Sequence, residues 1–297
     1  SRGLGDVYKR QIIEETVTID EIKGVYLSLD LLEEPVKVHL AQAKCYAYIY
    51  GIQNDLQKIN VQMTYGNLDT GDLKYFSYEY SMQQLQEWFS DLILKYKKWA
   101  DFQYEWRKKR QASIKELAFP FPYREGQKEL AAGVYRTIAR KKNLFIQAPT
   151  GVGKTISTLY PAIKAVGEGL GDKIFYLTAK TVTANVAKET LGILCEKGYR
   201  AKSVQITAKE KLCPCEEVDC NPVSCPYAKG HFDRVNDAVY ELWTTEEVYS
   251  REVIRAHAEK WQVCPFEMCL DLSIWVDGII CDCLLYTSDA ADDRISV

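Results

Sequence analysis

The chain has 297 residues, of which 47% are hydrophobic and 27% charged, a length and composition that fit one or two ordinary globular domains. Its formal net charge of −3 excludes binding of nucleic acid through overall positive charge, so any DNA contact must come from local basic patches such as residues 107–110 or 140–142. No apolar run reaches the roughly eighteen residues of a membrane span, and no charged start precedes an apolar leader, so we expect a cytoplasmic protein.

The two ends of the chain, residues 1–11 and 283–297, show no helix or strand periodicity that continues into their neighbours. Both resemble translated sequencing-adapter sequence, so we treat them as non-native and expect the natural protein to continue at both ends. Genuine disordered termini are the alternative. We therefore look for the fold between residues 12 and 282.

Residues 12–118 predict an α/β domain that ends in a long helix. Alternating apolar residues predict a strand within 12–30, and the pattern then predicts a helix at 36–54 and strands at 58–66 and 73–79. From Ser81 onward, apolar residues at helical spacing predict a helix that runs to the basic residues 107–110. Two prolines then break the chain, and we place the domain boundary after residue 118.

Beyond that boundary, helices and strands alternate. The expected helices cover 125–140, the residues up to 167 and 182–197, and the expected strands cover 143–147, 173–178 and 203–206. This βαβ rhythm predicts a parallel sheet covered by helices. The fold class is therefore α/β, and residues 119–207 form its first continuous part.

Residues 148–155, Ala-Pro-Thr-Gly-Val-Gly-Lys-Thr, match a phosphate-binding P-loop between a predicted strand and a predicted helix. Gly151 and Gly153 allow the turn that points backbone N–H groups at the phosphates. Lys154 is expected to reach the β- and γ-phosphates, and Thr155 to coordinate Mg²⁺. The pattern predicts a RecA-like core that binds ATP through Thr150, Gly151, Val152, Gly153, Lys154 and Thr155.

Gln127 ends the segment Tyr-Arg-Glu-Gly-Gln, about two dozen residues before the P-loop lysine. A glutamine amide both donates and accepts hydrogen bonds and can pair with the edge of adenine. Gln127 is therefore a candidate adenine reader, and an ordinary surface glutamine is the alternative.

Cysteines gather in one part of the chain, where six of the ten lie between Cys213 and Cys269. Such clustering favours a metal site over a disulfide framework. Zinc sites usually present C-x₂-C pairs, and none occurs here, so the spacings fit an iron–sulfur cluster better. A zinc site and scattered core cysteines remain the alternatives.

Together, the P-loop, the segment before it and the cysteines resemble the XPD/DinG-type iron–sulfur superfamily 2 DNA helicases over residues 119–282. The resemblance implies a RecA-like motor domain, an iron–sulfur insertion at 208–270 and a return to the motor at 271–282. It also implies an ATP-dependent DNA helicase that moves 5′→3′ on single-stranded or forked DNA, with ATP, Mg²⁺ and a 4Fe-4S cluster as cofactors. A zinc-stabilised P-loop ATPase and a non-motor DNA-binding module are the alternatives.

The resemblance assigns roles to individual residues. The family's motif Ia falls on the strand at 175–181, which implies that Thr178, Lys180 and Thr181 contact the DNA backbone. The family's cluster ligands fall on Cys213, Cys220, Cys225 and Cys264, with Cys215 as the alternative to Cys220. The family's DEAH box and second motor domain lie further downstream and are absent here, so we expect this chain to bind ATP without hydrolysing it or unwinding DNA.

The amino-terminal domain carries a second constellation. Glu21 and Lys23 stand two apart on a predicted strand, so their side chains face the same side. In a metal-dependent nuclease site of the (D/E)-x-K type, the carboxylate binds the metal and the lysine orients water. Gln42 and Tyr46, four apart on the following helix, share a face. This arrangement resembles the RecB-type PD-(D/E)xK nuclease core.

That nuclease family also needs an aspartate on the preceding strand, and the glutamates at 14–15 are poorly placed to replace it. Loss of the aspartate with the amino-terminal end and a degenerate, DNA-binding domain therefore both stay open. A charged strand edge beside a buried tyrosine is the alternative to any nuclease-like domain.

Overall fold

The computed structural model describes residues 9–13, 17–26, 28–149 and 151–282, and its contacts divide the chain into two compact units. Unit 1 comprises residues 1–98 and unit 2 residues 99–297. The expected non-native segment 283–297 and residues 1–8 of the other end lie outside the described residues. None of the described helices is both long and apolar enough to cross a membrane.

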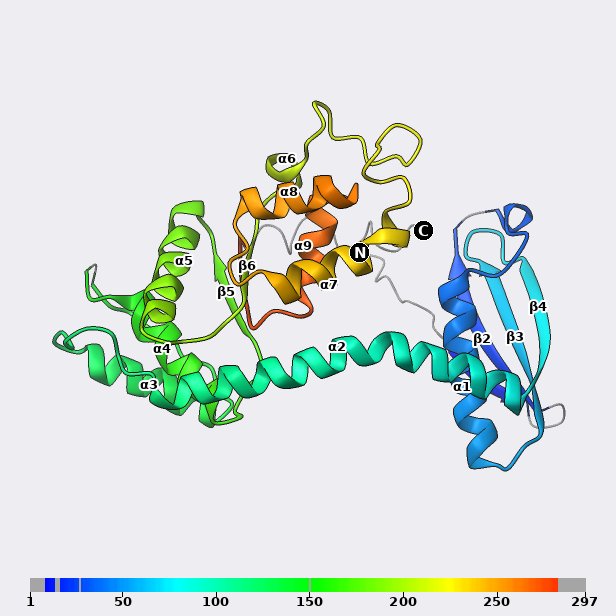
Figure 1. Ribbon diagram of the computed structural model, residues 1–297, viewed down its shortest axis with the longest axis horizontal. Helices are drawn as coiled ribbons and strands as arrows, with labels where there is room; N and C mark the ends of the chain where they lie inside the picture. The colour runs from blue at the N-terminus through cyan, green and yellow to red at the C-terminus, as the bar shows by residue number, and fades with distance from the viewer. Residues whose placement is uncertain (1–8, 14–16, 27, 150, 283–297) are drawn as a thin grey trace. The chain divides into compact units, whose positions relative to one another are not determined.

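Unit 1 is a mixed four-stranded sheet in the order β1-β2-β3-β4, covered by the helix α1 (Figure 1). Strands β2 and β3 are parallel, whereas β1–β2 and β3–β4 are antiparallel. The parallel pair needs a crossover connection, which α1 supplies. The elements are β1 (Lys9–Ile13), β2 (Thr18–Val25), α1 (Lys37–Gln53), β3 (Lys58–Asn67) and β4 (Leu73–Ser81), with a short 3-10 turn at Leu29–Leu31.

The core of unit 1 lies between α1 and one face of the sheet. Fully buried Ala43 and Ala47 on α1 allow the helix to lie close to Ile19, Val61 and Met63 on the strands. These three alternate with polar residues, as the period of two predicts for a sheet with one buried face. The helix and the last two strands expected here are confirmed almost to the residue.

The main chain of residues 9–11, which we left out of the fold argument as part of an expected non-native end, lies in strand β1. Lys9, Arg10 and Gln11 pair with Ile22, Glu21 and Asp20 of β2. Backbone hydrogen bonds along a free sheet edge require no apolar periodicity in the added strand, so the pattern Lys-Arg-Gln did not reveal it.

Helix α2 (Met82–Glu116) is one continuous helix of 35 residues that contributes to both units. Leu85 is buried in unit 1, whereas Trp99, Trp106 and Ile114 are buried in unit 2. Contacts therefore divide the chain between residues 98 and 99, inside the helix. We had expected the boundary after residue 118, which lies just beyond the end of α2 at Glu116.

Unit 2 contains a three-stranded parallel sheet in the order β5-β7-β6. The strands are β5 (Ile174–Thr178), β6 (Ser203–Ile206) and β7 (Gly278–Asp282). The central strand comes last in the sequence, so the chain leaves the sheet after β6 and returns to its middle. The predicted parallel sheet is confirmed, and β7 lies within the segment 271–282 that was expected to return to it.

Helices cover both faces of this sheet. Ile280 of β7 packs against Leu159 of α4 and Ala187 of α5 on one face. Its neighbour Ile279 points to the other face and joins the core built by α7, α8 and α9. The helices of unit 2 beyond α2 are α3 (Gln127–Ala139), α4 (Lys154–Gly167), α5 (Thr181–Glu196), α6 (Lys209–Leu212), α7 (His231–Thr245), α8 (Arg251–Trp261) and α9 (Pro265–Ser273).

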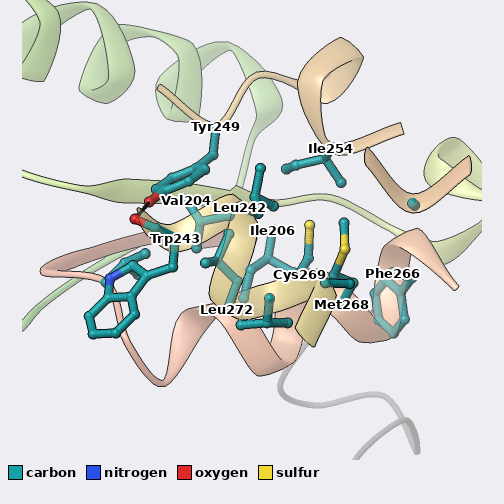
Figure 2. Close-up of a cluster of buried hydrophobic side chains, with 14 of the residues drawn as sticks. Val204, Ile206, Leu242, Trp243, Tyr249, Ile254, Phe266, Met268, Cys269 and Leu272 are labelled. Carbon is teal, nitrogen blue, oxygen red and sulfur yellow. Dashed lines mark hydrogen bonds between the residues drawn. The ribbon is translucent and has the colours of Figure 1, made fainter. Parts of the chain in front are cut away.

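The core between the sheet and α7–α9 is large and apolar (Figure 2). Val204 and Ile206 of β6 meet Leu242 and Leu272 there. The segment 208–270, expected as an insertion, therefore shares a core with the sheet. It packs its helices directly on one face of the strands that flank it in the sequence.

One expected strand does not form. Residues 143–147 form no strand and pair with none in the described part of the chain, and Phe145 is 96% exposed. The apolar residues have the pattern of a strand, but a strand forms only where a neighbouring strand pairs with its backbone N–H and C=O groups. β5 and β6 both pair with β7 instead.

Candidate functional site

The P-loop lies immediately before α4. The helix begins at Lys154, and its N-cap Gly153 has a φ of 75°. Gly151 also has a positive φ, 83°, which glycine adopts without strain. A Cβ on Gly153 would lie 2.6 Å from the side-chain nitrogen of Gln127, so close approach as well as conformation requires glycine there. Thr150 lies outside the described residues.

The side chain of Lys154 folds back into the loop. Its Nζ donates to the carbonyl oxygens of Ala148 at 2.8 Å and Pro149 at 3.2 Å. These oxygens satisfy the ammonium group in the same way that phosphate oxygens would. The N-terminus of α4 adds its partial positive charge beside the ammonium group, as anion sites at helix starts do. Val152 and Thr155 are half-buried next to it.

Gln127 is buried against the P-loop. Its amide nitrogen donates to the carbonyl of Val152 at 3.1 Å, and its amide oxygen accepts from the backbone N–H of Arg124 at 3.0 Å. The guanidinium of Arg124 itself donates to the carbonyl of Gly151. The alternative of a surface glutamine is therefore wrong, because Gln127 links the start of α3 to the phosphate loop.

Arg124 was missed as a P-loop contact, because an arginine in a polar connecting segment carries no pattern of its own. Its position three residues before Gln127 could have indicated that it lies near the P-loop.

The three residues expected to contact DNA lie between β5 and α5. Thr178 is buried, and its hydroxyl donates to the carbonyl of Lys180 at 2.7 Å and accepts the N–H of the same residue at 3.1 Å. This hydroxyl shapes the turn before the helix. Lys180 is exposed, and Thr181 is the first residue of α5. The cation of Lys180 is thus displayed beside the positive end of a helix, a suitable place for a phosphate.

Three cysteines of the insertion lie together. The Cys215 thiol lies close to the thiols of Cys213 and Cys225. Desolvation, followed by these two neighbouring sulfurs, raises the pKa of Cys215 to about 11. The structure thus groups the alternative candidate Cys215 with two of the expected ligands.

Cys220 and Cys264 are associated with a cation. Lys209 at the start of α6 donates to the sulfur of Cys220 at 3.6 Å. Its ammonium group also lies 3.7 Å from the carboxylate of Glu267. Burial raises the pKa of the Cys264 thiol, and the charge of Lys209 opposes this shift. Cys264 is the N-cap residue of α9, and its side chain makes no capping hydrogen bond.

A hollow of about 430 Å³ opens beside Cys213, the one candidate cysteine among its lining residues. Its other lining residues include Tyr227, Arg255 and Pro265. No three histidine, cysteine, aspartate or glutamate side chains among the described residues are grouped as a metal ion would require. Cys269, by contrast, is buried in the apolar core (Figure 2), and burial raises its pKa to about 12.

Unit 1 brings its four candidate residues together. Lys23 Nζ donates to Glu21 at 2.8 Å and to the amide oxygen of Gln42 at 2.9 Å. The amide nitrogen of Gln42 donates to the hydroxyl of Tyr46 at 3.3 Å. β2 supplies the charged pair and α1 the other two residues, as the spacing predicted. In the register of β1 and β2, Arg10 stands opposite Glu21.

Two further polar residues of unit 1 were missed. His39 stands three residues before Gln42 on α1, and its Nδ1 lies 3.0 Å from the hydroxyl of Tyr65. Burial and then the charge of Lys23 lower the pKa of His39. Its helical spacing from Gln42 could have revealed it, but Tyr65 reaches this place only through the parallel pairing of β2 and β3.

The pair of Glu21 and Lys23 should stabilise unit 1. Both side chains are almost inaccessible, so replacing Lys23 by methionine removes two hydrogen bonds of a buried charge. We expect the substitution to lower the free energy of opening of β2 and β3 by about 2 kcal/mol. The backbone amides of these strands should then exchange their hydrogens with solvent faster under native conditions.

Lys58→Met provides the matched control, because Lys58 pairs with Glu79 on the exposed surface. That change should cost less than about 0.5 kcal/mol, as surface ion pairs contribute little. Equal effects of the two substitutions would contradict the buried network.

Comparisons with known proteins identify one helicase-like region. A stretch of 51 residues is 51% identical to a protein of Methanocaldococcus jannaschii described as a probable ATP-dependent helicase. The stretch covers 17% of this chain and 8% of that protein, so the chain matches less than a tenth of its relative's length. No protein-family model matches the chain.

Proposed function

We propose that unit 2 is the nucleotide-binding motor region of an ATP-dependent DNA helicase that carries a 4Fe-4S cluster and moves 5′→3′. The observation that carries the proposal is the P-loop, whose two left-handed glycines lead into α4 while Lys154 turns its ammonium group into the loop. The local similarity to a probable ATP-dependent helicase supports the same function. ATP with Mg²⁺ is the nucleotide proposed, and single-stranded or forked DNA the partner.

The proposed RecA-like character is supported by the parallel sheet of unit 2. In open α/β sheets, ligands bind beyond the carboxyl ends of the strands. Thr178 and Asp282 end two neighbouring parallel strands at the same edge. We place the DNA-backbone contacts of Thr178, Lys180 and Thr181 at this edge, with the exposed cation of Lys180 as the main phosphate contact.

The cysteine spacings favour an iron–sulfur cluster over zinc, because zinc sites usually present C-x₂-C pairs and this segment has none. The proximity of the Cys215 thiol to those of Cys213 and Cys225 supports a site in this segment. We propose Cys213, Cys220, Cys225 and Cys264 as ligands, with Cys215 as the alternative to Cys220.

The test is the absorption spectrum and metal content of protein purified without oxygen. The proposal expects a broad band near ~400 nm and about four irons per chain, as a Cys₄-ligated cubane gives. Colourless protein with one zinc would support a zinc-stabilised P-loop ATPase instead. Protein with neither metal would overturn the cluster and leave the nucleotide site.

Serine variants identify the ligands in the same experiment. Cys225→Ser should lose the absorption band and most of the iron, whereas Cys269→Ser should keep both because Cys269 lies in the apolar core. The second ligand is decided by comparing Cys215→Ser with Cys220→Ser. Full iron in the Cys225 variant would exclude that residue as a ligand.

For unit 1 we propose a nuclease-like fold of the PD-(D/E)xK type. The connected side chains of Glu21, Lys23, Gln42 and Tyr46 support it, as does the crossover helix between two parallel strands. In a nuclease of this type, the carboxylate would bind a divalent cation and the lysine would orient the attacking water.

A further inference from the structure

The exposed side of α2 within unit 2 carries cations at helical spacing. Each of six residues there stands three or four positions from another, so the six share one face of the helix. They are Tyr104, Arg107, Lys108, Gln111, Ala112 and Lys115, and together they line a hollow of about 360 Å³. We call these six residues the cationic face, because three of them are basic and none is acidic.

The opposite side of the same helix explains why the cationic face points to solvent. Arg110 and Ile114 are buried in unit 2, and Arg110 pairs with Asp277 at 2.6 Å. The helix therefore divides the basic run 107–110. Its last member stabilises the fold, whereas its other cations stay at the surface.

The cations of this face are free to exchange their partners. Arg107 pairs with Asp172 at 3.0 Å and Lys108 with Glu105 at 3.1 Å, and both basic side chains are more than half exposed. Such surface pairs contribute little to stability, so phosphate oxygens can replace the carboxylates. Lys115 is exposed and pairs with no carboxylate in the described part of the chain.

Tyr104 adds an aromatic ring to the cations. It is 60% exposed, and the ammonium group of Lys108 lies 4.0 Å from the centre of its ring. Proteins bind single nucleic-acid strands with this combination, in which cations follow the phosphates and aromatic rings stack on bases. From Tyr104 to Lys115 the helix rises about 16 Å, which is long enough for several phosphates of one strand.

We propose that the cationic face of α2 binds a single DNA strand at a site separate from the edge of the parallel sheet. The phosphates lie along Arg107, Lys108 and Lys115, and one base stacks on Tyr104. DNA as the partner rests on the proposed function, but this site uses neither the P-loop nor Lys180. Two contacts on one strand bind it more tightly than either contact alone.

Removing two cations tests the contact with the phosphates. The double variant Lys108→Gln with Lys115→Gln should bind a labelled oligothymidylate about tenfold more weakly, measured by fluorescence anisotropy without nucleotide. Each phosphate contact adds about 0.7 to the slope of log affinity against log salt for a single strand, so the slope should become shallower by about 1.4. The control is Lys128→Gln with Lys197→Gln, which removes the same charge from exposed positions on α3 and after α5 and should leave the slope unchanged.

Two substitutions of Tyr104 test the contact with the base. Tyr104→Ala should weaken binding of the oligothymidylate about tenfold, whereas Tyr104→Phe keeps the ring and should stay within about twofold. A strand of the same length without bases should bind the wild type and the Ala variant equally. If the Ala variant bound the normal strand as tightly as the wild type, the face would recognise negative charge alone, as on an acidic protein segment, and the single-strand assignment would be overturned.

Lys180→Gln in the same assay distinguishes this inference from the proposed motor contact. Lost affinity in that variant, with wild-type affinity and salt slope in the Lys108 and Lys115 double variant, would overturn the cationic face alone. The reverse result would overturn the contact at the sheet edge and support the cationic face. Wild-type protein that binds no single strand would overturn both.

Discussion

Replacing Lys154 by alanine should weaken the binding of ATP with Mg²⁺ by at least about 100-fold. The ammonium group now satisfied by the carbonyls of Ala148 and Pro149 is the cation placed to take up phosphate oxygens. Hydrogen bonds from a charged donor contribute roughly 1.5–3 kcal/mol each, and each 1.4 kcal/mol is about tenfold in affinity. Titration calorimetry with ATP would measure the loss.

The control is Lys128→Ala, which removes an exposed lysine from α3 and should leave the affinity unchanged. The thermal midpoint of the Lys154 variant should stay close to that of the wild type, because its present partners are carbonyls at the surface. ATP binding of wild-type strength in this variant would exclude the P-loop as the nucleotide site.

Much of the fold follows from local periodicity. The alternation of helix and strand after residue 119 predicted β5, α5 and β6 because each element buries one face and shows that face in its sequence. Pairing is a different matter. Residues 143–147 have the apolar pattern of a strand but pair with no strand in the described part of the chain. Lys9–Ile13 lack that pattern but pair with β2.

The candidate site could be predicted where its residues are neighbours along one element. Glu21 and Lys23 on a strand, and Gln42 and Tyr46 on a helix, meet because strand and helix periods fix their directions. The cysteines lie on irregular segments, where spacing fixes no direction. The sequence therefore did not predict that Cys215 would contact Cys213 and Cys225, or that Lys209 would approach Cys220.

A buried ionic network was also invisible in the sequence. Asp277, immediately before β7, accepts hydrogen bonds from Arg110 at 2.6 Å, the indole of Trp106 at 2.8 Å and the backbone N–H of Lys202 at 2.9 Å. Arg110 and Trp106 stand four apart on α2, so the helix presents both to the same carboxylate. Helical spacing predicted the helix, but nothing in the sequence indicated that its partner would be Asp277, more than 160 residues away.

Lys202 belongs to the same network. Its ammonium group is fully buried, donates to the carbonyl of Glu246 and lies 4.7 Å from the ring centre of Trp106. Burial lowers the pKa of Lys202 to about 8. The α2 helix, the start of β6 and the start of β7 therefore meet around one carboxylate, and its loss should affect all three.

Replacing Asp277 by alanine should lower the unfolding free energy of unit 2 by about 3–5 kcal/mol, the usual cost of removing one partner of a buried ion pair. The side chains of Arg110 and Asp277 are 6% and 8% exposed, so water cannot replace the lost carboxylate without opening the core. Urea denaturation followed by tryptophan fluorescence would measure the change, because Trp106 reports directly on the site.

Asp172→Ala is the matched control, since that aspartate pairs with Arg107 of the same helix on the exposed surface. It should cost less than about 1 kcal/mol. Replacing Arg110 by methionine in the Asp277→Ala background should restore part of the stability, because the unpaired buried charge is then removed. If the double variant were as unstable as the sum of the single changes, the two side chains would act independently, and the carboxylate would matter mainly to Trp106 and the backbone of Lys202.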